Sequence, residues 1–292
     1  MTFLKYLLSS TVIGVVLTAP AAKAGEESAA HQIHYVTFSS LHKTPVPIGG
    51  RFIFPSNVQK GAKVPAVVVY HGSGGAMQRG ELYQNALADA GIASLALDAW
   101  TGRKIKSHKD RPQTVMETLP DAFGARKWLM AQPGIQGNNI GIMGFSWGGV
   151  VSMLSSTKAY KEQNSHDGGG FKAANPVYPV CWVYNAVPGY TFKQLTGIPM
   201  QIITGSEDAY NMDADTCPNL INSLDEGARK KISVQVLQGA HHSFDSPGEN
   251  RIVVDTYAHR GKGGPVPLRY NASATQQSLK LTVDFFSKAL KN

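Results

Sequence analysis

The stretch "NIGIMGFSWGGVVSML", residues 139–154, decides the fold of this chain. Its first half is apolar on both faces, a pattern typical of a strand buried inside a parallel sheet. Its second half carries small and apolar residues at helical spacing, beginning at Trp147. Only Ser146 separates the two halves, so the chain has to turn sharply there. The glycines at 144 and 148 permit the turn, because side chains at those positions would collide across it.

Strands and helices are predicted to alternate on either side of this unit. The expected strands cover residues 34–40, 50–56, 64–72, 92–100, 138–146, 179–185, 198–208 and 231–240. The expected helices cover residues 80–91, 114–132, 147–156, 213–229 and 274–290, with Pro120 either dividing the second or starting a new one. The first two strands are typical of an antiparallel pair at a sheet edge, and residues 158–171 and 258–271 are expected to be loops. This order predicts an α/β fold, with a mostly parallel sheet of about eight strands and helices on both faces.

The composition suits a single domain, which we expect over residues 25–292. Of 292 residues, 42% are hydrophobic and 16% are charged, which is enough apolar material for one sizeable core. The formal net charge of +8 can reflect a nucleic-acid partner, an anionic surface or solvation. Because no nucleic-acid-binding motif is apparent, we interpret the charge as mostly solvation and expect no nucleic-acid partner. The sequence leaves the oligomeric state open.

The first residues, "MTFLKYLLSSTVIGVVLTAPAAKAG", have the pattern of a secretory signal peptide over residues 1–24. Lys5 precedes an apolar run over residues 6–17, and Ala22 and Ala24 occupy the −3 and −1 positions. The run is shorter than the roughly 20 residues that span a bilayer. We therefore predict cleavage after Ala24, export to the periplasm or the cell exterior, and no stable membrane span afterwards.

Export favours a disulfide between Cys181 and Cys217, because thiols pair in oxidising compartments. The alternative is two separate buried thiols. A loop of about 36 residues closed by such a bond is worth about 4 kcal/mol in the chain-entropy model. Two isolated cysteines lack the tight spacing of a metal site, and no metal is expected.

Three side chains that could act together follow the ends of predicted strands: Ser146, Asp208 and His242. Catalytic groups gather at the carboxyl ends of the strands in this architecture. A serine hydroxyl is a weak nucleophile and needs a base that is itself oriented by an acid. The chain order serine, acid, histidine is the one found in the α/β-hydrolase fold.

Neighbouring residues compete for two of these roles. His241 is the rival base, and Glu207 is the rival acid, with Asp213 and Asp215 behind it. Adjacent residues point in different directions, so only one member of each pair can face the serine. These alternatives stay open on the spacing alone.

The segment "HGSGGAM", residues 71–77, follows the 64–72 strand and is rich in glycine. Glycines let a backbone approach a substrate closely. We expect the backbone amides of Ser73 and Trp147 to form an oxyanion hole for acyl transfer. A phosphate-binding loop is the weaker interpretation, because the G-x-x-x-x-G-K-[ST] pattern is missing.

Aromatic and basic residues near predicted strand ends are candidates for a substrate pocket, namely Trp100, Arg103, Trp182 and Tyr210. Arg103 belongs to the basic segment "GRKIKSHKDR", residues 102–111. This segment is either a solvated loop, which is the usual role of a charge run, or a region that attracts anionic esters.

From about Val64 to the last helix, the chain resembles the dienelactone hydrolase family. The resemblance rests on "GFSWGG" (144–149), "TGSEDAY" (204–210), "GAHHSFD" (239–245) and "RYNASATQQSLKLTVDFF" (269–286). The family pattern G-A-x-H-x-F implies that His242 is the base, and an acid three residues after a glycine implies Asp208. The family's oxyanion amides correspond to Ser73 and Trp147.

Two positions depart from the founding members of that family. They use a cysteine where this chain has Ser146, and a glutamate that governs the thiol where this chain has Gly72. The resemblance therefore implies an exported, serine-using relative rather than an enzyme for dienelactone itself. Its expected activity is hydrolysis of carboxylic esters or lactones of small molecules, with no cofactor. An acyltransferase, a peptidase or a binding protein on the same scaffold are the alternatives.

Overall fold

The computed structural model describes residues 30–76, 78–107 and 110–291. The strands are β1 (Gln32–Ser39), β2 (Pro47–Phe54), β3 (Val64–Tyr70), β4 (Ala93–Asp98), β5 (Ile135–Phe145), β6 (Ala174–Val177), β7 (Met200–Gly205), β8 (Ile232–Leu237), β9 (Asn250–Asp255) and β10 (Gly264–Arg269). The α-helices are α1 (Gln78–Asp89), α2 (Leu119–Met130), α3 (Trp147–Leu154), α4 (Lys158–Asn164), α5 (Thr216–Asn222), α6 (Glu226–Arg229), α7 (Ala258–Gly261) and α8 (Ala272–Lys291). Short 3₁₀ turns lie at Thr101–Arg103, Val115–Thr118 and Cys181–Val183.

The described residues form one eight-stranded sheet in the order β1-β2-β4-β3-β5-β6-β7-β8. β2 is antiparallel to both β1 and β4, and the remaining neighbours are parallel. The predicted α/β class, the number of strands in the main sheet and the antiparallel pair at its edge are confirmed. Because β3 to β8 run the same way, their carboxyl ends meet at one side, where the residues that follow them can converge.

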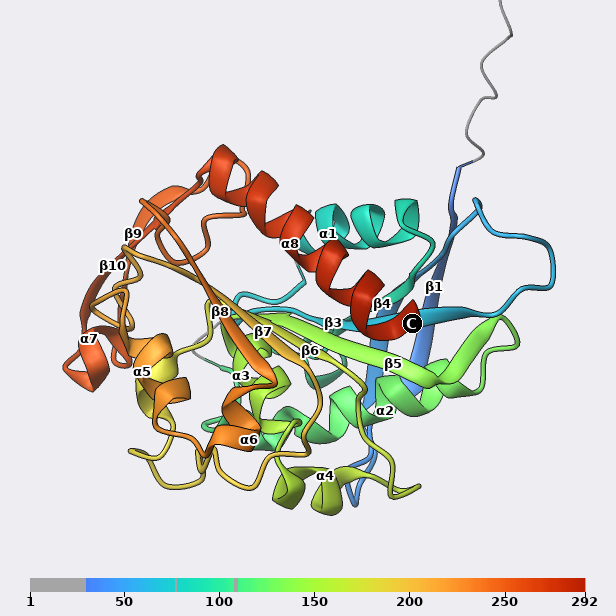
Figure 1. Cartoon of the computed structure of the whole chain (residues 1–292), viewed down its shortest axis with the longest axis horizontal. Coiled ribbons are helices and arrows are strands. Elements are labelled where there is room, and N and C mark those ends of the chain that lie inside the picture. The colour runs from blue at the N-terminus through green and yellow to red at the C-terminus, as the bar shows by residue number, and fades with distance from the viewer. Residues whose placement is uncertain (1–29, 77, 108–109, 292) are drawn as a thin grey trace, which may run out of the picture.

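Helices cover both faces of the sheet, as Figure 1 shows, with α1 and α8 on one side and α2 and α3 on the other. All seven residues of β3 are buried. Val68 and Tyr70 pack toward α2 and α3, whereas Val67 and Val69 pack toward α1 and α8. This alternation explains the continuous apolar run in the sequence, since each face of a doubly covered strand needs its own apolar set.

The sixth strand was predicted too late in the chain. Residues 179–185 are not a strand; β6 is Ala174–Val177, and the chain then leaves the sheet at Tyr178, whose φ of 37° is in the left-handed region. The apolar residues after it, including Val180 and Val183, line a cavity and form no strand. Periodicity cannot distinguish a buried strand from an apolar loop that packs on the core.

Both predicted loops contain regular structure. Residues 158–171 begin with α4, whose first turn is capped by the Thr157 hydroxyl accepting from the amide of Tyr160. Residues 258–271 contain α7 and β10, and β10 pairs antiparallel with β9 in a separate two-stranded sheet. Pro265 and Pro267 lie inside β10, and prolines in a sequence argue against a strand, which is why this hairpin was missed.

Two predicted helices are divided. In the 213–229 region, α5 ends at Asn222 and α6 begins after Asp225, whose side chain accepts from the amide of Ala228. In the 114–132 region, a 3₁₀ turn precedes α2, and Pro120 lies in the first turn of α2. Pro120 therefore starts a helix rather than breaking one, as its missing amide hydrogen allows.

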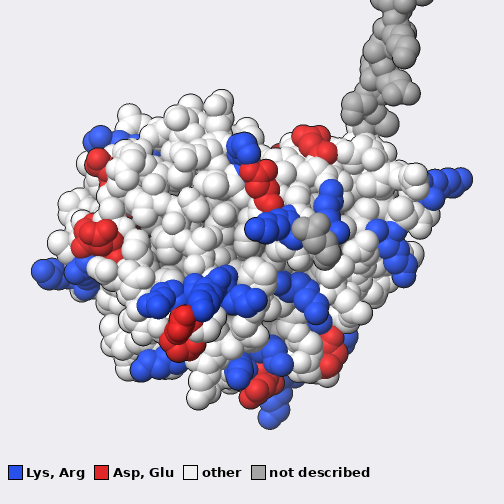
Figure 2. Space-filling model, viewed as in Figure 1, with Lys and Arg blue, Asp and Glu red and all other residues white. Residues whose placement is uncertain are grey.

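Charged side chains are spread over the face seen in Figure 2, where many Lys and Arg residues have Asp or Glu beside them. Surface pairs one helical turn apart join Glu226 of α6 to Lys230, the residue just after that helix, and Lys280 to Asp284 within α8. Within the described residues, no helix has both the length and the apolar content needed to cross a membrane. The predicted signal peptide, residues 1–24, lies outside them.

Candidate active site

Ser146 occupies the sharp turn between β5 and α3, with φ 52° and ψ −106°. A Cβ at Gly144 would lie 2.3 Å from the backbone of Gly148, and a Cβ at Gly148 would lie 2.3 Å from the carbonyl oxygen of Tyr70. Only glycine fits such contacts. The amide of Ser146 donates to the carbonyl of Val177 on β6 (3.0 Å), which fixes the turn to the sheet. A strained conformation at a polar residue marks a candidate functional site.

The structure brings Ser146, His242 and Asp208 together at the carboxyl ends of β5, β8 and β7. Nε2 of His242 lies 2.9 Å from Oγ of Ser146, and Nδ1 lies 2.8 Å from Oδ2 of Asp208. The other carboxylate oxygen of Asp208 accepts from the amide of Tyr210 at 3.0 Å. His242 and Asp208 are both buried. The three groups form a continuous hydrogen-bonded relay.

The rival residues lie elsewhere. Nδ1 of His241 is 3.2 Å from the carbonyl oxygen of Glu207, and Oε2 of the exposed Glu207 carboxylate lies 4.0 Å from Nε2 of the same ring. Asp213 pairs with Arg260, and its Oδ1 accepts from the amide of Asp215. These contacts involve neither Ser146 nor His242, so the geometry separates alternatives that spacing left open.

Ser73 and Trp147 both line the cavity beside Ser146. Trp147 is the first residue of α3, so its amide lies at the positive end of the helix dipole. The amide of the next residue, Gly148, donates to the carbonyl of His71 (3.1 Å), which holds the glycine-rich loop against this helix. A Cβ on Gly72 would lie 3.6 Å from Cβ of Ser146, so the loop backbone passes directly beside the serine.

The cavity beside Ser146 is mainly apolar. It is lined by Ser73, Arg111, Gln113, Val115, Ser146, Trp147, Val150, Val180, Val183, Tyr190, Tyr210, Asp255 and Tyr257. Apart from Ser73, Arg111, Ser146, Trp147 and Tyr210, these residues were not singled out from the sequence. They come from segments far apart in the chain and share no motif, so only the folded chain identifies them.

Of the four predicted pocket residues, only Tyr210 lines this cavity. The Trp100 indole donates to the carbonyl of Ser73 (3.0 Å), behind the glycine-rich loop. Arg103 turns to the buried carboxylate of Asp121, 2.9 Å away. Trp182 donates from its indole to the carbonyl of Tyr257 (3.2 Å). Position at a strand end did not identify cavity residues here, because these three side chains bind hydrogen-bond acceptors instead of lining the cavity.

Tyr210 and Asp255 connect the relay to the β9–β10 hairpin. The Tyr210 ring lies 4.4 Å from the ring of His242, and its hydroxyl donates to Oδ2 of Asp255 at 3.1 Å. Burial, followed by the nearby charge of Asp255, raises the pKa of the Tyr210 phenol. The phenol therefore remains a hydrogen-bond donor at neutral pH, and it ties the hairpin to the loop that carries Asp208.

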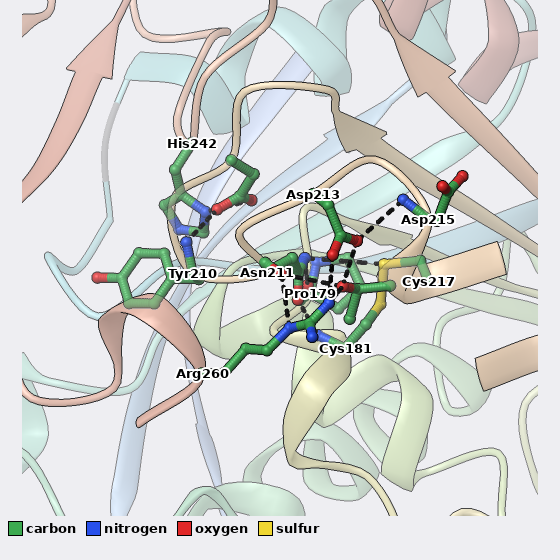
Figure 3. The surroundings of a disulfide bond; sticks show 11 residues. Pro179, Cys181, Tyr210, Asn211, Asp213, Asp215, Cys217, His242 and Arg260 are labelled. Carbon is green, nitrogen blue, oxygen red and sulfur yellow. Dashed lines mark hydrogen bonds and ion pairs between the residues drawn. A yellow bond between two sulfur atoms is a disulfide. The ribbon is translucent and has the colours of Figure 1, made fainter. Parts of the chain in front are cut away.

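Cys181 and Cys217 form the predicted disulfide. Figure 3 shows Asn211 beside it. The Asn211 side-chain oxygen accepts from the backbone amide of Cys181 (2.8 Å), and the backbone amide of Asn211 donates to the carbonyl of Asp208 (3.1 Å). The disulfide joins α5 to the segment that contributes Val180 and Val183 to the cavity wall, and Asn211 links that segment to the loop that carries Asp208. Among the described residues, no three His, Cys, Asp or Glu side chains are grouped to hold a metal ion.

The order of the sheet and the strained serine turn define the class of this protein as an α/β-hydrolase. The model of the dienelactone hydrolase family matches residues 50–290. The chain belongs to the dienelactone hydrolase family and is a carboxylic ester hydrolase. A comparison with curated proteins finds no match.

Solved structures share the fold at low sequence identity. A dienelactone hydrolase from Anabaena variabilis has a TM-score of 0.59 at 16% identity, over 89% of this chain and 99% of that one. Esterase 2 of Thermogutta terrifontis, solved after phosphorylation by paraoxon, has a TM-score of 0.58 at 16% identity, over 90% and 95% of the two chains. An acylaminoacyl peptidase from Pyrococcus horikoshii has a TM-score of 0.60 at 17% identity, over 90% of this chain and 42% of that one.

Proposed function

We propose that this chain hydrolyses carboxylic ester or lactone bonds of small molecules through an acyl-enzyme on Ser146. The observation that carries the proposal is the relay from Asp208 through His242 to Ser146, with bond lengths of 2.8 and 2.9 Å. A nucleophile, a base and an orienting acid in contact form the constellation that acyl transfer requires.

The reaction has two steps. His242 accepts the hydroxyl proton as Oγ of Ser146 attacks the ester carbonyl, and the amides of Ser73 and Trp147 donate to the resulting oxyanion. The tetrahedral intermediate collapses as His242 gives its proton to the departing alcohol oxygen, which leaves an acyl-serine. Water, deprotonated by His242, then attacks the acyl carbon, and Ser146 leaves with the proton restored. Asp208 orients the imidazole and stabilises its cation throughout.

The cavity favours a neutral, apolar acyl group. Valine and aromatic side chains form most of its wall. Among the described residues of the basic segment, only Arg111 lines the cavity. The Asp255 carboxylate lies 3.8 Å from its guanidinium. Arg103 is engaged with Asp121. An anionic ester would have to compete with Asp255 for Arg111, so the expectation of an anionic substrate is the weaker alternative.

The proposal is tested with an activated ester and a matched variant. The wild-type protein should release a burst of p-nitrophenol from p-nitrophenyl butyrate and should be labelled by a fluorophosphonate probe. Ser146→Ala should lose both while unfolding at the same temperature or slightly above, because it removes one hydroxyl from a strained turn. Equal turnover by the two proteins would exclude Ser146 as the nucleophile, and a wild-type protein inert both to esters and to the fluorophosphonate probe would contradict the proposal.

The same relay can serve transfer to an alcohol or cleavage of an amide. A panel of p-nitrophenyl esters, small lactones and aminoacyl p-nitroanilides, each with and without an added acceptor alcohol, separates these reactions. We expect ester turnover in water alone, no p-nitroaniline release, and little transfer product. Amide cleavage at a comparable kcat/KM would instead favour the peptidase alternative.

A further inference from the structure

The glycine-rich loop beside Ser146 is held from behind by the buried side chain of His71, which the reaction described above does not use. His71 is the first residue after β3 and is 6% exposed. Its Nδ1 lies 2.7 Å from the carbonyl oxygen of Gly72, and its Nε2 accepts a hydrogen bond from the amide of Ala99 at 2.9 Å.

These two contacts fix the protonation of the ring. The amide of Ala99 can only donate, so Nε2 of His71 must carry a lone pair. The single proton of a neutral imidazole is then on Nδ1, where it is donated to the carbonyl of Gly72. Burial lowers the pKa of His71 to about 4, so this neutral form persists at neutral pH. His71 is therefore a fixed donor to the loop rather than a titrating group.

The carbonyl of Gly72 belongs to the same peptide group as the amide nitrogen of Ser73. In a trans peptide the C=O and N–H bonds point in opposite directions. A donor that holds the Gly72 oxygen on one side directs the Ser73 N–H to the other side, away from His71. Hydrogen bonding at a carbonyl also polarises its peptide group, which makes its N–H a stronger donor. The His71 contact therefore affects both the direction and the strength of the Ser73 donor.

Two further contacts support the same peptide groups. The amide of Gly75 also donates to the Gly72 oxygen, at 3.0 Å, so that oxygen accepts from two donors. The indole of Trp100 donates to the carbonyl of Ser73 at 3.0 Å, which fixes the following peptide group. Gly75 has φ +89°, and a Cβ there would lie 3.1 Å from the Trp100 ring, so the turn and the indole are closely fitted.

We propose that His71 is a positioning residue for the reaction, which acts through the carbonyl of Gly72 to aim and polarise the Ser73 amide at the oxyanion. The inference rests on the proposed function, because it needs an oxyanion to form on a substrate bound at Ser146. It assigns His71 to the stabilisation of the intermediate and not to substrate binding. Loss of the His71 donor should therefore lower kcat and leave KM nearly unchanged.

The test compares His71→Asn with His71→Leu. The asparagine and leucine side chains have the same branching and nearly the same size, and neither reaches the amide of Ala99 that Nε2 of His71 accepts from. Only asparagine keeps an N–H near the position of Nδ1. We expect His71→Leu to lower kcat for p-nitrophenyl butyrate by 30- to 100-fold, with KM within about twofold of wild type, since loss of a complete oxyanion donor costs about 10²–10³. His71→Asn should retain at least fivefold more kcat than His71→Leu.

A second measurement separates positioning from general damage to the site. A trifluoromethyl ketone forms a tetrahedral adduct with an oxyanion, whereas its parent alcohol forms none. His71→Leu should weaken inhibition by the ketone by at least tenfold and inhibition by the alcohol by less than twofold. Should His71→Leu fail to fold, Trp100→Phe removes the donor to Ser73 while keeping an aromatic ring, and it should give the same pattern more weakly.

The outcomes distinguish the two proposals. Wild-type protein without ester turnover or fluorophosphonate labelling would contradict the proposed function itself. An active wild type with equal kcat losses in His71→Asn and His71→Leu would overturn the positioning role alone. Equal weakening of ketone and alcohol inhibition would do the same, because it would show a distorted pocket instead of a misdirected donor.

Discussion

Arg111 of the basic segment and Asp255 of β9 face one another at 3.8 Å, beside the cavity that contains Ser146. The guanidinium of Arg111 also lies over the ring of Trp147, 5.3 Å from its centroid. Asp255 in turn accepts from the Tyr210 hydroxyl. The pair therefore connects the hairpin to both sides of the cavity, and the extent to which Asp255 neutralises Arg111 affects whether an anionic ester can bind there.

Asp255→Asn should uncover the charge of Arg111. We expect kcat/KM for an aryl hemisuccinate, which carries a carboxylate, to rise several-fold relative to the neutral butyrate ester. The gain should shrink as ionic strength increases from 10 to 300 mM, because salt screens the attraction between Arg111 and an anionic ester approaching through solvent. Arg111→Gln is the matched control and should abolish the gain in the double variant. A ratio that Asp255→Asn leaves unchanged would show that Arg111 does not select substrates.

The turn at Ser146 depends on glycine at position 148. Gly148→Ala places a methyl group 2.3 Å from a carbonyl oxygen of β3, so the strand and helix must separate. We expect the free energy of unfolding in urea to fall by more than about 2 kcal/mol. Gly80→Ala, in α1, has no atom within 4 Å of its new Cβ and should be neutral or stabilising by up to about 1 kcal/mol. Similar effects of the two substitutions would contradict a steric origin.

Acid should destabilise the fold through His71. Its pKa is lowered from 6.5 to about 4 in the folded protein, so between these values the unfolded chain binds more protons. The stabilisation is complete above pH 6.5 and is lost as the pH falls to about 4. The difference corresponds to about 3 kcal/mol. Urea unfolding of wild type and His71→Asn should converge by about this amount between pH 7 and pH 4. Parallel curves across that window would contradict the assignment.

Removal of the disulfide should destabilise the loop that carries Asp208. Replacing both Cys181 and Cys217 by alanine should lower the free energy of unfolding by about 4 kcal/mol, since it frees a loop of 36 residues. Wild-type protein in dithiothreitol should show the same loss, and the alanine variant should not respond to the reductant. A loss below about 1 kcal/mol would mean that the hydrogen bonds of Asn211 hold this loop without the disulfide.

Much of the fold was predictable because the main sheet is buried on both sides. A strand such as β3 must then be apolar throughout, as must the second half of β5, and that pattern is visible without coordinates. The hairpin of β9 and β10 was not predictable, because it packs only one face against the domain and contains two prolines. β6 was misplaced because an apolar segment that lines a cavity resembles a strand in sequence.

The sequence by itself determined the serine turn, the α/β class with its mostly parallel sheet, and the family, because local sterics and apolar periodicity act between near neighbours in the chain. The family resemblance already favoured His242 and Asp208, but only the tertiary structure decided that these side chains contact each other and Ser146. It alone also decided that Arg103 and two tryptophans lie outside the cavity. Those outcomes depend on where separate strands end in space and which acceptors are within reach. Neither quantity is encoded in the spacing of residues along the chain.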